Sequence, residues 1–167
     1  VLAEMDQVNL VRIYNADKIV SRSVLYVVPE EFKEQRKMLN RGLTEAIFAD
    51  KVLLVEGPSE MVLFGKVLSE KKPFYEADGI YILSVGGFGF KPYQSILNAL
   101  KIYNVVKTDN DLRKPRNKET YSVLGFIRLN GLIGETILPE DPVNEKSVAA
   151  KRELYDKNRE TLDRINP

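Results

Sequence analysis

A short apolar run that leads into a glycine flanked by acids reads Lys51-Val52-Leu53-Leu54-Val55-Glu56-Gly57-Pro58-Ser59-Glu60. Its first five residues have the length and the β-branched content of a buried strand. Pro58 fits the first turn of a helix, and Glu60 places a negative charge at the positive end of the helix dipole. We therefore predict a strand over residues 51–55 and a helix over residues 58–70.

The same alternation continues along the chain. Residues 79–85 and 102–107 are candidate strands, and residues 92–100 fit a helix opened by Pro92. A β-α-β-α-β order is typical of a mainly parallel sheet covered by helices on both faces. We predict an α/β fold of this kind, in which ligands bind at the carboxyl ends of the strands.

The flanking segments follow other patterns. Residues 8–14 and 18–28 read as an N-terminal β-hairpin, and residues 29–48 read as a linking helix that Gly42 can split. Residues 121–132 are ambiguous. An amphipathic helix is predicted from Ser147 onward, with Val148, Leu154, Leu162 and Ile165 near one face. The predicted domains are a hairpin at 1–28, a linking helix at 29–48, an α/β domain at 49–140 and a terminal helix at 141–167.

Composition limits the chemistry. The chain has 167 residues, enough for one substantial core, and it contains neither Cys nor His. This excludes disulfides, thiolate zinc sites and His-dependent catalysis, and leaves carboxylates, amines, hydroxyls and hard cations such as Mg²⁺. The net charge of +1 means that any affinity for nucleic acid must come from local patches. No run is long enough to cross a membrane and no signal pattern is present, so we expect a cytoplasmic protein, here as a fragment of a longer one.

Two acidic pairs follow predicted strands. Glu56 and Glu60 follow the first strand, although Glu60 could serve only the helix dipole and Glu56 could be only a solvated strand end. Asp109 and Asp111 follow the last strand in Lys107-Thr108-Asp109-Asn110-Asp111, where a simple turn is the alternative. Four carboxylates at one edge of a sheet would repel one another strongly, and a divalent cation is the simplest resolution.

Other residues near these acids suit a phosphate backbone. Gly86 and Gly87 lie in a glycine-rich turn that could approach a phosphate, although a tight strand-to-helix turn explains them as well. The basic residues near the Asp pair could bind the DNA backbone or form a solvated loop, and they are Lys107, Arg113, Lys114, Arg116 and Lys118. No nucleotide-hydrolysing P-loop motif is present.

At this point the sequence resembles a known family. The lead-in Phe48-Ala49-Asp50-Lys51, the following Glu56-Gly57 and Glu60, the Gly-Gly turn and Thr108-Asp109-Asn110-Asp111 look like the Toprim domain of OLD (overcoming lysogenization defect) nucleases. The resemblance covers roughly residues 39–112. Its lead-in favours a nuclease over the topoisomerases and primases that also carry Toprim domains.

The resemblance implies a metal-dependent DNA endonuclease. Glu56, Glu60, Asp109 and Asp111 would hold one or two Mg²⁺ or Mn²⁺ ions, with Glu56 and Asp109 as the catalytic pair. Family members add an ABC-type ATPase domain on the amino-terminal side, so ATP would act only through a domain outside this chain. The resemblance also implies a homodimer or higher oligomer and a role in phage defence. A topoisomerase or primase Toprim domain, or a non-catalytic one used for DNA binding or interaction, remains the alternative.

Overall fold

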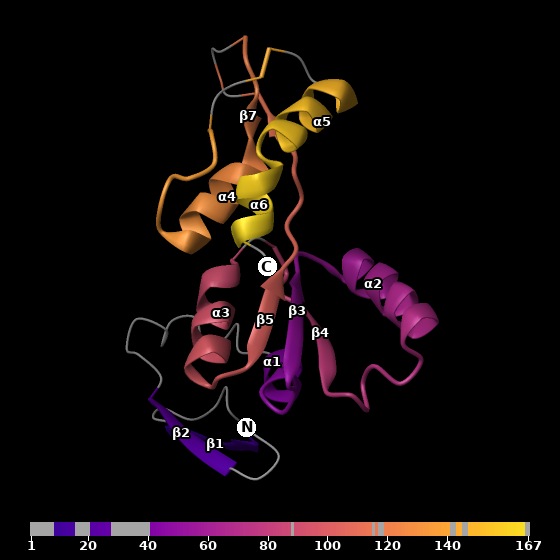
Figure 1. Cartoon of the computed structure of the whole chain (residues 1–167), viewed down its shortest axis with the longest axis vertical. Coiled ribbons are helices and arrows are strands. Elements are labelled where there is room, and N and C mark those ends of the chain that lie inside the picture. Colours follow the sequence, from indigo (N-terminus) through magenta and orange to yellow (C-terminus); the bar gives the residue numbers. More distant parts are fainter. Residues whose placement is uncertain are drawn as a thin grey trace. The chain divides into compact units, whose positions relative to one another are not determined.

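The structure is a computed structural model of the chain and describes residues 9–15, 21–27, 41–87, 89–114, 116, 119–140, 143–144 and 147–165 (Figure 1). The chain divides between Lys107 and Thr108 into two compact units. Each unit is described by itself. Among the described residues, no helix has the length and apolar character that crossing a membrane requires.

The first unit is built on a parallel three-stranded sheet. Its strands are β3 (Lys51–Val55), β4 (Ile80–Ser84) and β5 (Tyr103–Val106), in the order β4-β3-β5. The central strand β3 is the most deeply buried, because Leu54 and Val55 have no exposed surface and Val52 retains only 2%. The predicted parallel sheet is therefore confirmed, with strand ends within two residues of those expected.

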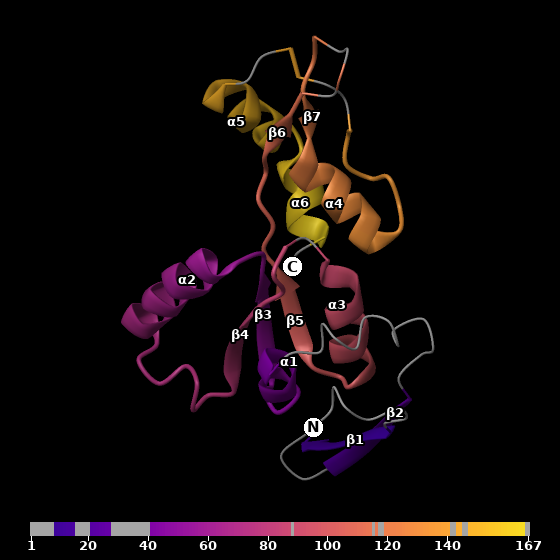
Figure 2. The ribbon, with the colours of Figure 1, turned by 180° about the vertical axis from the view of Figure 1, so that it is seen from behind.

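Helices flank this sheet. They are α1 (Arg41–Ala46), α2 (Pro58–Lys71) and α3 (Phe90–Ala99). The chain moves outward from β3 to β4 and then back across β3 to β5, so right-handed crossovers place α2 and α3 on opposite sides of the sheet, as both views show (Figures 1 and 2). The α3 helix buries Phe90, Tyr93, Ile96 and Leu97, whereas α2 buries no side chain completely.

A tight turn fixes where β3 and β4 begin. Gly79 has φ 70°, and its carbonyl accepts hydrogen bonds from the backbone N–H groups of Asp50 at 2.8 Å and Lys51 at 3.0 Å. A Cβ atom on Gly79 would lie 2.6 Å from Asp50 Oδ2. The lead-in residue Asp50 therefore has a structural role against a glycine that no side chain can replace without strain.

The predicted hairpin is present as β1 (Asn9–Asn15) and β2 (Ser21–Val27), paired antiparallel. Its expected turn falls partly on residues outside those described, as does most of the helix predicted over 29–48, of which α1 is the described part. Arg12 on β1 donates hydrogen bonds to the carbonyls of Leu100, Lys101 and Ala49 and contacts Asp50 Oδ1 at 3.2 Å. The hairpin is thereby attached at the end of α3 and the start of β3.

The second unit contains a small sheet and three helices. The strands are β6 (Leu112–Arg113) and β7 (Ser122–Val123), and the helices are α4 (Leu124–Ile133), α5 (Val148–Lys157) and α6 (Arg159–Ile165). Four buried residues form the core, and they are Leu112, Val123, Phe126 and Leu138, with Leu154, Leu162 and Ile165 packed against them. The ambiguous segment at 121–132 thus resolves into a short strand followed by a helix.

The prediction of one terminal helix from Ser147 was wrong in two respects. The α5 helix ends at Lys157, the side chain of the next residue, Asn158, donates to the carbonyl of Leu154 at 2.8 Å, and α6 begins at Arg159. Asparagine competes in this way with the backbone bonds of a helix. Val148 was expected on the apolar face, but its side chain is 82% exposed because the core contacts begin only at Leu154.

Candidate metal centre

The strand-end glutamate is held through its backbone. Val85 N–H donates to the carbonyl of Val55 at 3.0 Å, and Gly87 N–H donates to the carbonyl of Glu56 at 2.7 Å. Gly86 and Gly87 both have positive φ, 71° and 137°, which favours glycine at each. The glycine-rich turn therefore carries out the structural role predicted for it, and it fixes the backbone from which the half-buried Glu56 side chain extends.

Glu60 makes two contacts of its own. Its Oε2 atom accepts the backbone N–H of Gly57 at 3.1 Å, which satisfies a free donor at the start of α2, and its Oε1 atom lies 3.7 Å from Lys107 Nζ. The side chains of Glu60 and Lys107 are only 17% and 32% exposed. Glu60 therefore has the role at the helix start that the sequence offered as an alternative. The ammonium group of Lys107 also shows that a positive charge can lie next to the Glu60 carboxylate.

The second acidic pair lies in the second unit, where α4 holds its backbone. The carbonyl of Asp111 accepts Leu124 N–H at 2.8 Å. Arg128 Nη1 donates to Thr108 Oγ1 at 3.2 Å and to the carbonyl of Asp109 at 3.3 Å. Asp109 is half-buried and Asp111 is exposed. Sequence reasoning missed Arg128, although an arginine inside the apolar run 124–133 was a signal that it has a specific partner.

Each unit therefore contributes one carboxylate pair. Glu56 and Glu60 follow β3 in the first unit, and Asp109 and Asp111 follow β5 at the start of the second. Neither unit, in the residues described, gathers three or more acidic side chains closely enough to hold a metal ion. The oxygen donors are of the kind that Mg²⁺ and Mn²⁺ prefer, so their chemistry fits these ions, and the four-carboxylate site remains a prediction.

Three of the basic residues predicted to contact DNA are exposed, whereas Lys107 is partly buried and Lys118 lies outside the described residues. Arg113, Lys114 and Arg116 all lie on the surface of the second unit. Lys114 Nζ pairs with Glu119 Oε2 at 3.2 Å and lies 6.0 Å from the centre of the Tyr121 ring. Lys114 is thus engaged within the chain, and a phosphate would compete with Glu119 for it.

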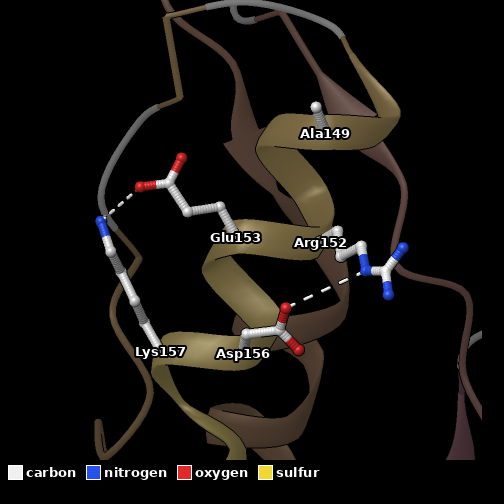
Figure 3. A pocket seen from close by; sticks show the side chains of 5 residues that line it. All are labelled: Ala149, Arg152, Glu153, Asp156 and Lys157. Atoms are coloured by element: carbon white, nitrogen blue, oxygen red, sulfur yellow. Dashed lines mark hydrogen bonds and ion pairs between the residues drawn. The ribbon is translucent and has the colours of Figure 1, made fainter.

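A shallow hollow on α5 is formed by one helix alone. Figure 3 shows its lining side chains, which are Ala149, Arg152, Glu153, Asp156 and Lys157. Lys157 donates to Glu153 at 2.6 Å, and this bond together with the attraction of the ammonium lowers the pKa of Glu153. Lys157 and Glu153 form an i,i+4 ion pair, as do Arg152 and Asp156, and such pairs are typical of a solvent-exposed helix face. The hollow is therefore not a candidate catalytic site.

The three-stranded parallel sheet, with acids after the strands at both β3 and β5, defines a Toprim-type α/β domain. Residues 47–111 match the family model described as "Overcoming lysogenization defect protein-like, TOPRIM domain". The matched segment is therefore an OLD-like Toprim domain. It is 41% identical over 164 residues, 95% of its length, to a protein named Endonuclease GajA from Bacillus cereus (strain VD045), and it spans 28% of that protein's length.

Proposed function

We propose that this chain is the Toprim part of an OLD-family endonuclease that hydrolyses phosphodiester bonds in DNA. The similarity to a protein named as an endonuclease carries this proposal. It is supported by carboxylates that follow two strands of one parallel sheet, at the edge where ligands bind in such folds. DNA is then the substrate.

In this proposal Glu56, Glu60, Asp109 and Asp111 hold one or two Mg²⁺ or Mn²⁺ ions. When bound, such ions activate water and stabilise the negative charge that develops on the phosphate. The residues of the chain orient the groups around them. Gly87 fixes the backbone of Glu56, and Lys107 neutralises Glu60 until a cation or a phosphate arrives. The exposed Arg113, Lys114 and Arg116 then contact the DNA backbone.

The partners of this domain are also proposed from the similarity to the endonuclease. Because the chain spans 28% of the relative's length, a preceding ABC-type ATPase domain is proposed to lie outside it, and ATP would act there. The exposed apolar side chains of the β1–β2 hairpin, Val11, Ile13, Leu25 and Val27, agree with a neighbouring domain that covers them. A homodimer or higher oligomer, a cytoplasmic location and a role in phage defence are proposals that rest on the family.

The test is cleavage of supercoiled plasmid in the presence of Mg²⁺, Mn²⁺ or EDTA. We expect metal-dependent cutting that falls about a hundredfold or more in Glu56→Ala and in Asp109→Ala/Asp111→Ala. A matched control is Glu153→Ala/Asp156→Ala, which removes two exposed carboxylates from α5 and should leave cutting unchanged. Undiminished cleavage by the first two variants would contradict the proposal.

A non-catalytic Toprim domain is the second candidate, and one observation favours it. Both oxygens of Glu60 have partners within the chain, Gly57 N–H and Lys107. A domain whose acids serve only its own stability would bind DNA or another protein without a cation. Calorimetric titration with Mn²⁺ distinguishes the two candidates, because only the nuclease should bind the ion and lose that binding in Asp109→Ala/Asp111→Ala.

A further inference from the structure

The N-terminal turns of α4 hold residues 108–111 at two hydrogen-bonded points. Leu124 N–H, the first amide of the helix, donates to the carbonyl of Asp111 at 2.8 Å. One turn later, Arg128 Nη1 bridges Thr108 Oγ1 at 3.2 Å and the carbonyl of Asp109 at 3.3 Å. Both ends of the acidic segment are thus attached to one helix, within the second unit.

A glycine brings the middle of the segment against the same helix. Gly125 is buried, and a Cβ atom there would lie 2.7 Å from Asn110 Oδ1, 3.0 Å from Asn110 Cα and 3.2 Å from Asn110 Cβ. Because one of these atoms belongs to the backbone, rotation of the asparagine side chain would not relieve the contact. The buried Asn110 Oδ1 accepts no hydrogen bond from the described residues, and it is the Asn110 atom nearest to the position of such a Cβ.

We infer that Gly125 and Arg128 are positioning residues for the carboxylates of Asp109 and Asp111. The inference rests on the proposed function, since it assigns these carboxylates to a divalent cation. Metal ligands must be held to within a fraction of an ångström, and the groups that orient them contribute strongly to affinity. Here the backbone on either side of Asn110 is fixed by α4, and the directions of both Asp side chains depend on that backbone.

Two alanine variants of the same helix make the first test. Gly125→Ala fills the contact with Asn110, whereas Gly131→Ala lies on the exposed side of α4 and meets no atom within 4 Å. Both replace a glycine of α4 by alanine, and only Gly125→Ala meets another segment of the chain, so Gly131→Ala is its control. In EDTA, we expect amide hydrogen exchange of residues 108–112 to be about tenfold or more faster in Gly125→Ala and unchanged in Gly131→Ala.

Cation binding supplies the second readout. Calorimetric titration with Mn²⁺ should give a Kd about tenfold or more weaker for Gly125→Ala and an unchanged Kd for Gly131→Ala. Arg128→Ala should behave like Gly125→Ala, and Arg128→Lys should recover part of the affinity. Arg152→Ala on α5 is the matched control for loss of an arginine. Circular dichroism verifies folding, and if Gly125→Ala does not fold, Arg128→Ala decides because it only removes atoms.

The outcomes separate the inference from the proposed function. Exchange in Gly125→Ala and Arg128→Ala equal to that of their controls would overturn the inference, and so would faster exchange with unchanged Mn²⁺ affinity. Failure of the unsubstituted chain to bind Mn²⁺ would contradict the proposed metal site instead. The amide hydrogen exchange measured in EDTA would still show whether α4 restrains residues 108–111.

Discussion

At the scale of single residues, the lead-in to β3 has a physical explanation. Asp50 lies between Arg12, whose guanidinium contacts its Oδ1 atom at 3.2 Å, and Gly79, whose missing side chain leaves room for its Oδ2 atom. The carbonyl of the neighbouring Ala49 also accepts a bond from Arg12. These residues therefore join three segments of the chain, which explains the lead-in without giving it a catalytic role.

A pair of glycines tests this account. Gly79→Ala and Gly86→Ala both place alanine at φ near 70°, at a cost of about 1 kcal/mol for the backbone conformation alone. Only Gly79→Ala also meets Asp50, so we expect it to lower the free energy of unfolding by a further 1 to 3 kcal/mol or so. Urea unfolding at 25 °C measures both, and equal destabilisation would show that the contact with Asp50 does not matter.

In the second unit, Asn130 is a buried polar side chain that joins segments of the chain, as Asp50 does in the first unit. It is 4% exposed, and its amide group makes four hydrogen bonds, to the backbone N–H groups of Ile137 and Leu138, the carbonyl of Leu138 and the carboxylate of Glu140. A buried polar side chain is tolerated because its donors and acceptors are satisfied in this way. The bond to Glu140 joins the end of the segment at 137–140 to α4.

At the scale of elements, the helices differ in what holds them. The α3 helix is anchored by four buried side chains, whereas α5 has none and packs on the core of its unit through the partly buried Leu154. Ser147 caps α5, since its Oγ atom accepts the backbone N–H of Ala150 at 3.0 Å. The cap supplies a partner for one of the helix donors that would otherwise face only water.

Removing this cap should be measurable. Ser147→Ala is expected to lower the free energy of unfolding by about 1 kcal/mol, and Ser147→Asp to keep it near the original value because aspartate also accepts the bond. Thermal unfolding followed by circular dichroism would check both variants. If the two variants were equally stable, the hydrogen bond of Ser147 would contribute nothing to α5.

At the scale of the whole molecule, the hairpin has two different faces. Arg12 attaches one face to the α/β unit, while Val11, Ile13, Leu25 and Val27 present apolar side chains that are 60% to 75% exposed on the other. The strand register places these four residues on the same side of the pair. This is the surface that the proposed ATPase domain would cover.

Polar substitution of this face should leave the isolated chain stable. Ile13→Thr/Leu25→Thr places β-branched side chains at both positions of exposed strands, so we expect a change within about 0.5 kcal/mol and less self-association in sedimentation experiments. The same change on the buried strand, Val52→Thr/Leu54→Thr, should cost at least about 2 kcal/mol because it buries hydroxyl groups. A large loss from the hairpin variant would show that its apolar face is already covered within this chain.

The local elements of the α/β unit could be predicted because neighbouring residues decide them. The apolar run at 51–55, Pro58 at a helix start and the glycines near 86–87 each determine backbone conformation with little help from distant segments, and parallel strands connected by helices follow right-handed rules. Segment 121–132 was ambiguous because its burial depends on a partner, the core around Leu112 and Leu138, that lies elsewhere in the chain.

The sequence by itself determined the parallel sheet, the order of its elements and the placement of Glu56, Glu60, Asp109 and Asp111 after strands, because strand direction and chain order are local properties. Only the tertiary structure decided what those residues touch. The bonds of Glu60 to Gly57 N–H and to Lys107, and the hold of Arg128 and Gly125 on residues 108–111, bring together positions up to 47 residues apart in the sequence. No periodicity encodes such contacts, since they arise from side chains that meet only after the elements have packed.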